Sequence, residues 1–206
     1  MHCFFVSDLH GHQHRYEQLF AAIERERPDA VLFGGDLLPG AHRAAAAQFP
    51  VVRDFIADYL AARLSALKNL MGDEYPRICI VLGNDDPRRV EADLLDPRYA
   101  GLWEYAHQRR VALGDFAVYG YNYVPPTPFQ LKDWERYDVS RYVEPGCVSP
   151  EEGRRSVPVE PSEARYATIQ EDLETLTEGE DLADASCSFM LPRTTPCSTA
   201  RRWTAG

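Results

Sequence analysis

The sequence has no apolar run close to the ~18 residues that span a membrane, and its first residues lack the basic segment of a secretion signal. Basic residues are few: 22 Lys and Arg stand against 32 Asp and Glu, and the net charge of -10 opposes non-specific binding to nucleic acid or anionic membrane. The five cysteines are an odd number without CxxC spacing, which is typical of reduced, buried thiols. These absences predict a soluble cytoplasmic protein that binds a small substrate or a metal ion.

The first half of the chain alternates short apolar runs with segments of helical periodicity. The runs at 2–6, 30–33 and 78–82 are typical of buried strands, and 14–27 and about 47–71 carry apolar residues at helical spacing. This order predicts an α/β fold whose strands are parallel and joined by right-handed crossovers. With 206 residues, 45% of them hydrophobic, we expect one domain. No GxGxxG follows the first run, which disfavours a nucleotide-binding Rossmann domain.

The second half predicts elements of a different kind. The run 111–124 has the pattern of an antiparallel hairpin turned at Gly114–Asp115. Further on, Ser162 is expected to cap a helix over 163–178, and Gly179 is expected to end it.

The segment 125–161 is rich in Pro, Gly, Glu and Arg. A long irregular segment inside a compact domain is usually a functional lid or a floppy loop. Its aromatic residues favour a packed loop over a disordered linker. They are Phe129, Trp134, Tyr137 and Tyr142.

A polar motif follows each of the three predicted parallel strands. SDLHG occupies 7–11, GGD occupies 34–36 and GND occupies 83–85. Because the carboxyl ends of parallel strands lie along one edge of a sheet, where open α/β folds bind their ligands, we expect the three motifs to converge. Their order, each after a strand, is far more specific than any one motif alone.

The residue types in these motifs suit a metal site. Asp8 and His10 are two residues apart, so strand alternation would direct both side chains to one ion. The glycines before Asp36 and Asn84 allow a close approach of the backbone. Carboxylate, imidazole and amide oxygen together suit Mn, Fe or Zn better than calcium.

Each motif also has a structural interpretation. Histidines at a strand-to-helix junction are often solvated turn residues, and a Gly-Gly-Asp sequence can be an ordinary turn. Asp86 followed by Pro87 is typical of a helix N-cap with proline at the first helical position, so we interpret Asp86 as structural. Asn84 and Asp85 are not explained in this way.

The three motifs resemble the D-x-H, GD and GN(H/D) motifs of the calcineurin-like metallophosphoesterases, and the stretch GYNYVPPTPFQLKDWERYD resembles uncharacterised bacterial members. The resemblance implies a four-layer α/β/β/α sandwich, incomplete at the C-terminus. It also implies that two divalent ions (Mn, Fe, Zn or Ni) activate a bridging hydroxide for in-line attack on a small phosphate ester. The metal ligands that it implies are Asp8 and His10 for the first ion, Asp36 for both ions and Asn84 for the second.

The chain departs from the family pattern at the candidate catalytic position. Asp85 stands where many members carry a histidine that protonates the leaving group. Nearby dications favour the ionised form of an aspartate, which makes Asp85 a poor proton donor. Either another group donates the proton or the substrate has a good leaving group. The resemblance assigns no role to His12 and His14, which we interpret as bystanders or rim residues.

The C-terminal end departs further. The family's fourth and fifth motifs contain histidines that supply the remaining metal ligands, but this chain has no histidine after His107. After a strand start at 185–189 the apolar periodicity is lost, and a slip of one nucleotide near Phe189 permits the reading HAPPYDTVLDRAALDG, which resembles the fourth motif. We therefore expect a phosphoesterase domain over 1–189 and an out-of-frame tail over 190–206, with a natural tail as the alternative.

Two classes of function remain open from the sequence. The first is a metal-dependent phosphoesterase, a hydrolase, with impaired activity in this form. The second is a catalytically inactive pseudoenzyme that binds a ligand or a protein through the same cleft and the aromatic segment. The motifs do not distinguish phosphomonoesters from phosphodiesters, and they leave the physiological metals and the oligomeric state open.

Overall fold

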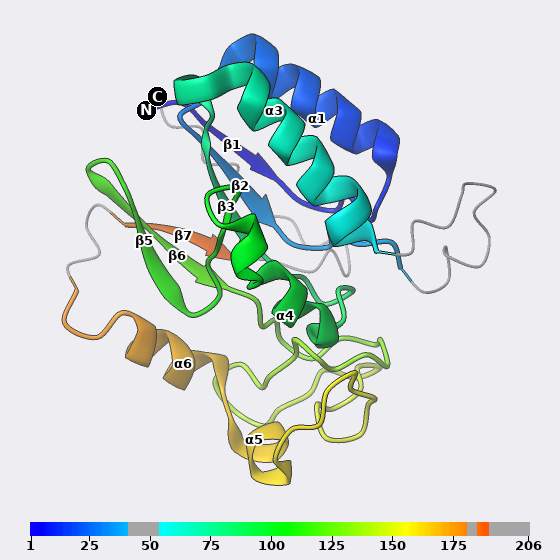
Figure 1. Cartoon of the computed structure of the whole chain (residues 1–206). Coiled ribbons are helices and arrows are strands. Elements are labelled where there is room, and N and C mark those ends of the chain that lie inside the picture. Colours follow the sequence, from blue (N-terminus) through cyan, green and yellow to red (C-terminus); the bar gives the residue numbers. More distant parts are fainter. Residues whose placement is uncertain (41–53, 181–184, 190–206) are drawn as a thin grey trace.

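The computed structural model describes residues 1–40 and 54–180, together with the backbone of 185–189. The described chain forms two β-sheets with helices on their outer sides (Figure 1). The first sheet is parallel and has the strand order β1-β2-β3-β4. Its strands are β1 (Cys3–Val6), β2 (Ala30–Gly34), β3 (Arg77–Val81) and β4 (Glu104–Tyr105).

The second sheet has the order β5-β6-β7. Its strands are β5 (Arg109–Leu113), β6 (Phe116–Tyr121) and β7 (Ala185–Phe189). The predicted hairpin is confirmed, because β5 and β6 are antiparallel and Gly114 adopts a φ of 60° in the turn between them. The predicted strand at 185–189 is also confirmed, and it runs parallel to β6.

The helices connect these strands in the predicted order. The longest described helix is α1 (Gln13–Glu26), which ends where Arg27 adopts a left-handed φ of 45° before Pro28. The π-helical segment η1 (Phe55–Ala61) leads directly into α3 (Ala62–Met71), and the Asp54 side chain caps η1 by accepting a hydrogen bond from the Ala57 amide. The remaining described helices are η2 (Gly72–Glu74), η3 (Arg88–Val90), α4 (Glu91–Leu94), η4 (Pro97–Tyr99), α5 (Pro161–Tyr166) and α6 (Ile169–Leu176). No described helix is long and apolar enough to cross a lipid bilayer.

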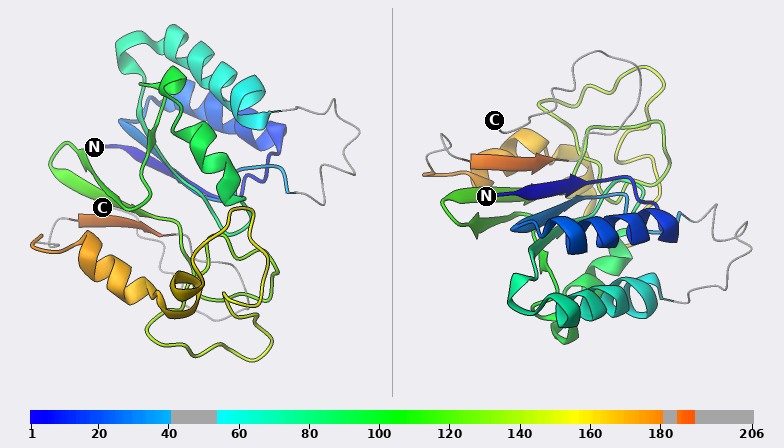
Figure 2. Two further views of the ribbon diagram at one scale, coloured as in Figure 1. Left: turned by 60° about the horizontal axis from the view of Figure 1, so that its bottom comes forward. Right: turned by 90° about the horizontal axis from the view of Figure 1, so that it is seen from above.

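The layers follow the order that the four-layer sandwich requires, so the predicted fold class is confirmed. Helices α1 and α3 cover one face of the first sheet, the second sheet lies on its other face, and α6 lies beyond the second sheet (Figure 1 and Figure 2). Tyr16 and Ile23 of α1 and Phe33 of β2 are completely or almost completely buried in the core between the helices and the first sheet. Burial of each such side chain contributes about 1.5–3 kcal/mol.

The predicted burial of β1 is wrong. The apolar run at 2–6 predicts a buried strand, but β1 lies at the edge of the described four-stranded sheet, and Cys3 and Phe5 are exposed. A continuous apolar run does not reveal whether a strand has one neighbour or two, because that depends on pairings with distant segments. The expectation of buried thiols holds for Cys79, whereas Cys147 is only partly buried.

The helix expected over 163–178 is divided into α5 and α6. The division occurs because Thr168 is extended, with φ of -120° and ψ of 151°, and its side chain accepts a hydrogen bond from the Glu171 amide at 3.2 Å. Ser162 therefore lies inside α5 rather than at its N-cap. The start of the helix predicted over 47–71 and the predicted tail over 190–206 lie outside the described residues.

The segment 125–161 is packed, as its aromatic residues indicated. Trp134 and Tyr137 are buried, whereas Phe129 and Tyr142 are exposed. Within the segment, the ammonium group of Lys132 binds the Glu135 carboxylate and donates a hydrogen bond to the Thr127 carbonyl at 2.8 Å. The side chains of Lys132 and Glu135 are 0% exposed, and a buried ion pair needs such additional hydrogen bonds to be stable.

A partly buried histidine, His107, connects this segment to the second sheet. The ring of His107 lies 5.0 Å from Trp134 and 5.3 Å from Tyr123, measured between centroids. Its Nδ1 accepts a hydrogen bond from the Asn122 amide at 3.1 Å. Burial, with the nearby charges of Arg88 and Arg136, lowers the pKa of His107 to about 3, so the ring is neutral.

The variant His107→Asn tests this neutral state. Because the folded pKa of His107 lies below the unfolded value of about 6.5, the protein loses stability as pH falls from that value toward the folded pKa. In the variant, an amide oxygen can accept the Asn122 hydrogen bond, but no titrating ring remains. Between about pH 6 and about pH 4, we expect the free energy of unfolding to fall more steeply with falling pH in the wild type than in the variant. The difference between the two slopes should be up to about 1.4 kcal/mol per pH unit. Urea unfolding over this range measures both slopes, and equal slopes would contradict a neutral His107 ring in the folded protein.

Candidate metal centre

The structure brings three of the predicted metal ligands together. Asp8 and His10 follow β1, Asp36 follows β2, and the ligand atoms of the three side chains all lie within 4.8 Å of one another. His10 Nε2 lies 3.9 Å from an Asp8 oxygen. Asp36 is 7% exposed, while Asp8 and His10 are half-buried, so the cluster opens to solvent on one side.

The loops that follow β1 and β2 are joined by main-chain hydrogen bonds, as the two strands are. The Asp8 amide donates a hydrogen bond to the Gly35 carbonyl at 3.1 Å, and the His10 amide donates to the Asp36 carbonyl at 2.7 Å. The Gly11 amide then donates to the Leu37 carbonyl at 2.7 Å. The backbone around the cluster is therefore held by main-chain hydrogen bonds beyond the end of the sheet.

All three clustered residues adopt left-handed backbone conformations. The φ angles are 59° at Asp8, 48° at His10 and 52° at Asp36, and among the described residues only Arg27 and Gln108 are further non-glycine residues with positive φ. Such conformations cost on the order of 1–3 kcal/mol each and gather at functional sites. They also correct the predicted geometry: β1 ends at Val6, so backbone turns rather than strand alternation bring Asp8 and His10 together.

The charge of the cluster is unbalanced. Burial and the neighbouring carboxylates of Asp86, Asp85 and Asp8 raise the pKa of Asp36 to about 7. The Asp85 amide partly offsets this by donating a hydrogen bond to Asp36 Oδ1 at 3.0 Å. A divalent cation bound by these oxygens would reverse the repulsion and favour the ionised carboxylates, so the donor set fits a metal ion.

Asp86 is structural, but for a different reason from the predicted one. It does not cap the following helical turn, whose N-cap residue is Pro87. Its carboxylate instead accepts hydrogen bonds from the Leu37 amide at 3.1 Å, the Leu38 amide at 2.8 Å and the Gly83 amide at 2.9 Å. Asp86 is 0% exposed, and burial raises its pKa to about 6 despite these bonds. It therefore ties the loop after β2 to the loop after β3.

The other predicted site residues lie around this cluster. Asn84 is buried directly beyond the end of β3, and Asp85 is exposed with a carboxylate oxygen 3.9 Å from His10 Nδ1. His12 precedes α1, and its carbonyl accepts a hydrogen bond from the Arg15 amide at 2.9 Å. His14 is exposed on α1, and neither His12 nor His14 belongs to the cluster.

Two contacts to Asp8 were not predicted. The Ser7 hydroxyl donates a hydrogen bond to the Asp8 carboxylate at 2.5 Å, and the Arg15 guanidinium donates one to the Asp8 carbonyl at 2.6 Å. Ser7 lies inside the SDLHG motif, so its position beside Asp8 was the only sequence signal. The Arg15 contact depends on how α1 leaves the loop and has no signature in the sequence.

Comparisons with known proteins give a family match. The model of the calcineurin-like phosphoesterase family matches residues 1–146. The search of curated proteins finds no match. Among solved structures, the crystal structure of TT1561 of Thermus thermophilus is 16% identical with a TM-score of 0.44, and the match covers 90% of this chain and 64% of that chain. A second crystal structure is 20% identical with a TM-score of 0.35, over 58% of this chain and 51% of that chain. The chain thus spans less than two thirds of either structure.

The variant Asp86→Ala tests whether this carboxylate holds the two loops. Three backbone amides would lose their acceptor, and each buried unpaired donor costs about 1–3 kcal/mol. We expect the free energy of unfolding to fall by at least about 3 kcal/mol, measured by guanidinium unfolding. The neighbouring Asp85→Ala is the matched control and should cost less than about 1 kcal/mol, because that side chain is exposed. Similar losses in both variants would show that other contacts hold the loops.

Proposed function

The chain belongs to the calcineurin-like phosphoesterase family, and from this premise we propose that it is a metal-dependent phosphoesterase. The observation that carries the proposal is the convergence of Asp8, His10 and Asp36, each in a left-handed conformation, at the carboxyl edge of the parallel sheet. Carboxylate and imidazole ligands held in a strained, hydrogen-bonded backbone favour binding over a solvated turn.

The proposed ligand set divides between two divalent ions. Asp8 and His10 would hold the first ion, Asp36 would be shared, and Asn84 would contribute to the second. Mn, Fe, Zn and Ni all suit this set. When bound, such ions neutralise phosphate oxygens and activate a water molecule as the nucleophile.

The chain's own residues would orient the centre and limit the substrates. The Ser7 hydroxyl fixes one Asp8 oxygen, and the Asp85 amide fixes one Asp36 oxygen, so both carboxylates are oriented in advance. The Asp85 side chain is exposed beside His10, and divalent ions bound next to it would make a carboxylate a poor proton donor. We therefore propose small phosphate esters with good leaving groups, such as aryl phosphates, as the substrates that react fastest.

The net charge of -10 supports a small substrate over nucleic acid. The cytoplasmic location and the division at residue 189 stay predictions from the sequence.

Substitution of the ligands tests the proposal. Asp36→Ala and His10→Ala should each lower kcat/KM for an aryl phosphate by more than about a hundredfold with Mn²⁺ present, since each removes a proposed ligand. His14→Ala is the matched control, because His14 is an exposed histidine outside the cluster. Steady-state assays with mono- and diesters, each with Mn²⁺, Fe²⁺, Zn²⁺ and Ni²⁺, provide the measurement. Absence of turnover with all four metals would favour the catalytically inactive pseudoenzyme instead.

The variant Asp85→Asn tests the role of the candidate catalytic position. A general acid typically contributes about 100- to 10,000-fold to the rate. Because Asp85 is not expected to donate a proton, its replacement should lower kcat by less than about tenfold. A loss as large as that of Asp36→Ala would refute this assignment.

A further inference from the structure

The backbone that leads to Asn84 is held by side chains rather than by neighbouring strands. The Leu82 amide donates a hydrogen bond to Asn122 Oδ1 at 3.1 Å, and the Gly83 amide donates to Asp86 Oδ2 at 2.9 Å. Leu82 and Gly83 are buried, so water does not replace these acceptors. Asn84 is the next residue, and its position depends on these two bonds.

The need for Asn122 arises where the chain crosses from the first sheet to the second. The Ala106 amide still donates to the Ile80 carbonyl at 2.9 Å, but the chain then leaves β3, and the Gln108 amide donates to the Gly120 carbonyl at 2.8 Å. Leu82 lies two residues after Ile80, so its amide faces the side that the departing chain has left. The Asn122 oxygen takes the place of the missing strand carbonyl.

Gly120 permits this crossing. A Cβ atom at Gly120 would lie 2.4 Å from the Ala106 carbonyl oxygen, which is too close for any other residue. The two sheets therefore approach each other next to Asn122, directly behind the end of β3.

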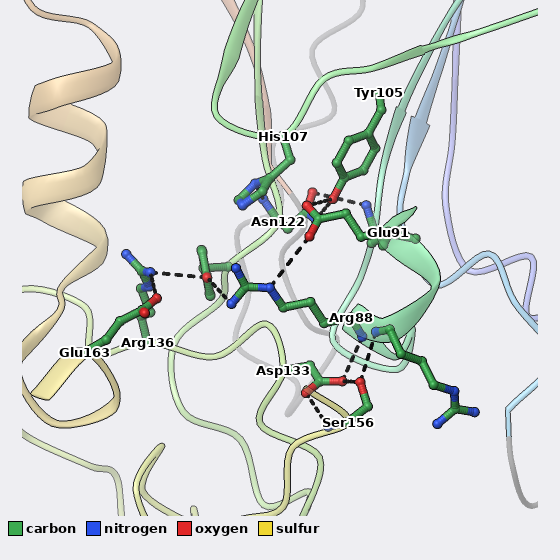
Figure 3. A network of polar contacts seen from close by, with 12 residues as sticks. Arg88, Glu91, Tyr105, His107, Asn122, Asp133, Arg136, Ser156 and Glu163 are labelled. Atoms are coloured by element: carbon green, nitrogen blue, oxygen red, sulfur yellow. Dashed lines mark hydrogen bonds and ion pairs between the residues drawn. The ribbon is translucent and has the colours of Figure 1, made fainter. Parts of the chain in front are cut away.

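The Asn122 side chain is itself fixed. It is 0% exposed, and its Nδ2 donates a hydrogen bond to the Tyr105 hydroxyl at 2.7 Å (Figure 3). The Tyr105 hydroxyl donates in turn to Glu91 at 2.9 Å. Because the Leu82 amide can only donate and Tyr105 has already given its proton to Glu91, Asn122 must present its oxygen to Leu82 and its nitrogen to Tyr105.

We propose that Asn122 is a positioning residue of the candidate centre, which holds the end of β3 and thereby places Asn84 for the second metal ion. The inference rests on the proposed function. Asn122 lies 40 residues from Leu82 in the sequence and outside the three polar motifs. In this proposal Asn122 acts through the Leu82 amide and is not itself a ligand of the metal ions.

A titration of the full chain with Mn²⁺ tests this proposal. Electron paramagnetic resonance measures the free Mn²⁺ at each step and so gives the Kd. Outer partners of metal ligands typically contribute about 10- to 100-fold to metal affinity, so Asn122→Ala should raise the Kd of the weaker Mn²⁺ site by at least about tenfold. Thr127→Val is the matched control. Thr127 is also buried, and its hydroxyl donates a hydrogen bond to Glu135 within the segment 125–161. Its substitution should change the Kd by less than about twofold.

A double-mutant cycle with Asn84→Ala separates positioning from general stability. If Asn122 acts through Asn84, Asn122→Ala should change Mn²⁺ affinity by less than about twofold once Asn84 is removed. A merely structural role predicts the same loss in both backgrounds. Tyr105→Phe, which keeps the Leu82 contact but removes the hydroxyl that orients the amide, is the milder variant for the same cycle, with an expected loss of about threefold.

The outcomes separate the two proposals. A wild type that binds Mn²⁺, together with an Asn122→Ala variant that binds it equally well, overturns the positioning role alone. An equal loss with and without Asn84 overturns it as well. A wild type that binds no Mn²⁺ overturns the proposed function and the inference together.

Discussion

The arrangement of the candidate centre depends on the hydrogen bonds that the Asp86 carboxylate accepts from three backbone amides. This carboxylate is fully buried and accepts hydrogen bonds from Leu37, Leu38 and Gly83, so it joins the loop that carries Asp36 to the loop that carries Asn84. Three amides beyond the ends of parallel strands need acceptors, and a buried carboxylate needs donors. The amides and the carboxylate bind each other, and these hydrogen bonds hold the loops after β2 and β3 in one relative position.

A side chain also accepts a hydrogen bond from a backbone amide beyond the end of β3, at Leu82. There the acceptor is the amide oxygen of Asn122, and it comes from the second sheet. The candidate centre is therefore supported by both sheets, although its proposed ligands all follow strands of the first. The packed segment 125–161 adds a third support, because Asp133 accepts hydrogen bonds from the Arg88 amide at 2.7 Å and from Ser156. These contacts anchor the turn that follows Asp86.

Strain and charge point to the same use of the site. Left-handed conformations at Asp8, His10 and Asp36 cost free energy. So do the burial of the Asp36 carboxylate and its repulsion by the neighbouring carboxylates, which together raise the pKa of Asp36. Neutral side chains would avoid the repulsion, and a turn without positive φ angles would avoid the backbone cost. A divalent cation would offset these costs, since it neutralises the carboxylates and uses the geometry that the strained backbone provides.

The sequence by itself determined the alternation of strands and helices, the hairpin of β5 and β6, and the convergence of Asp8, His10 and Asp36, because periodicity and the geometry of parallel strands are local or general rules. It did not determine that β1 lies at an edge, that Thr168 divides a helix, or which amides Asp86 holds. Only the tertiary structure decided these features. The amides bound by Asp86 after β2 and by Asn122 lie 48, 49 and 40 residues away, and a hydrogen bond between such distant groups leaves no spacing in the sequence.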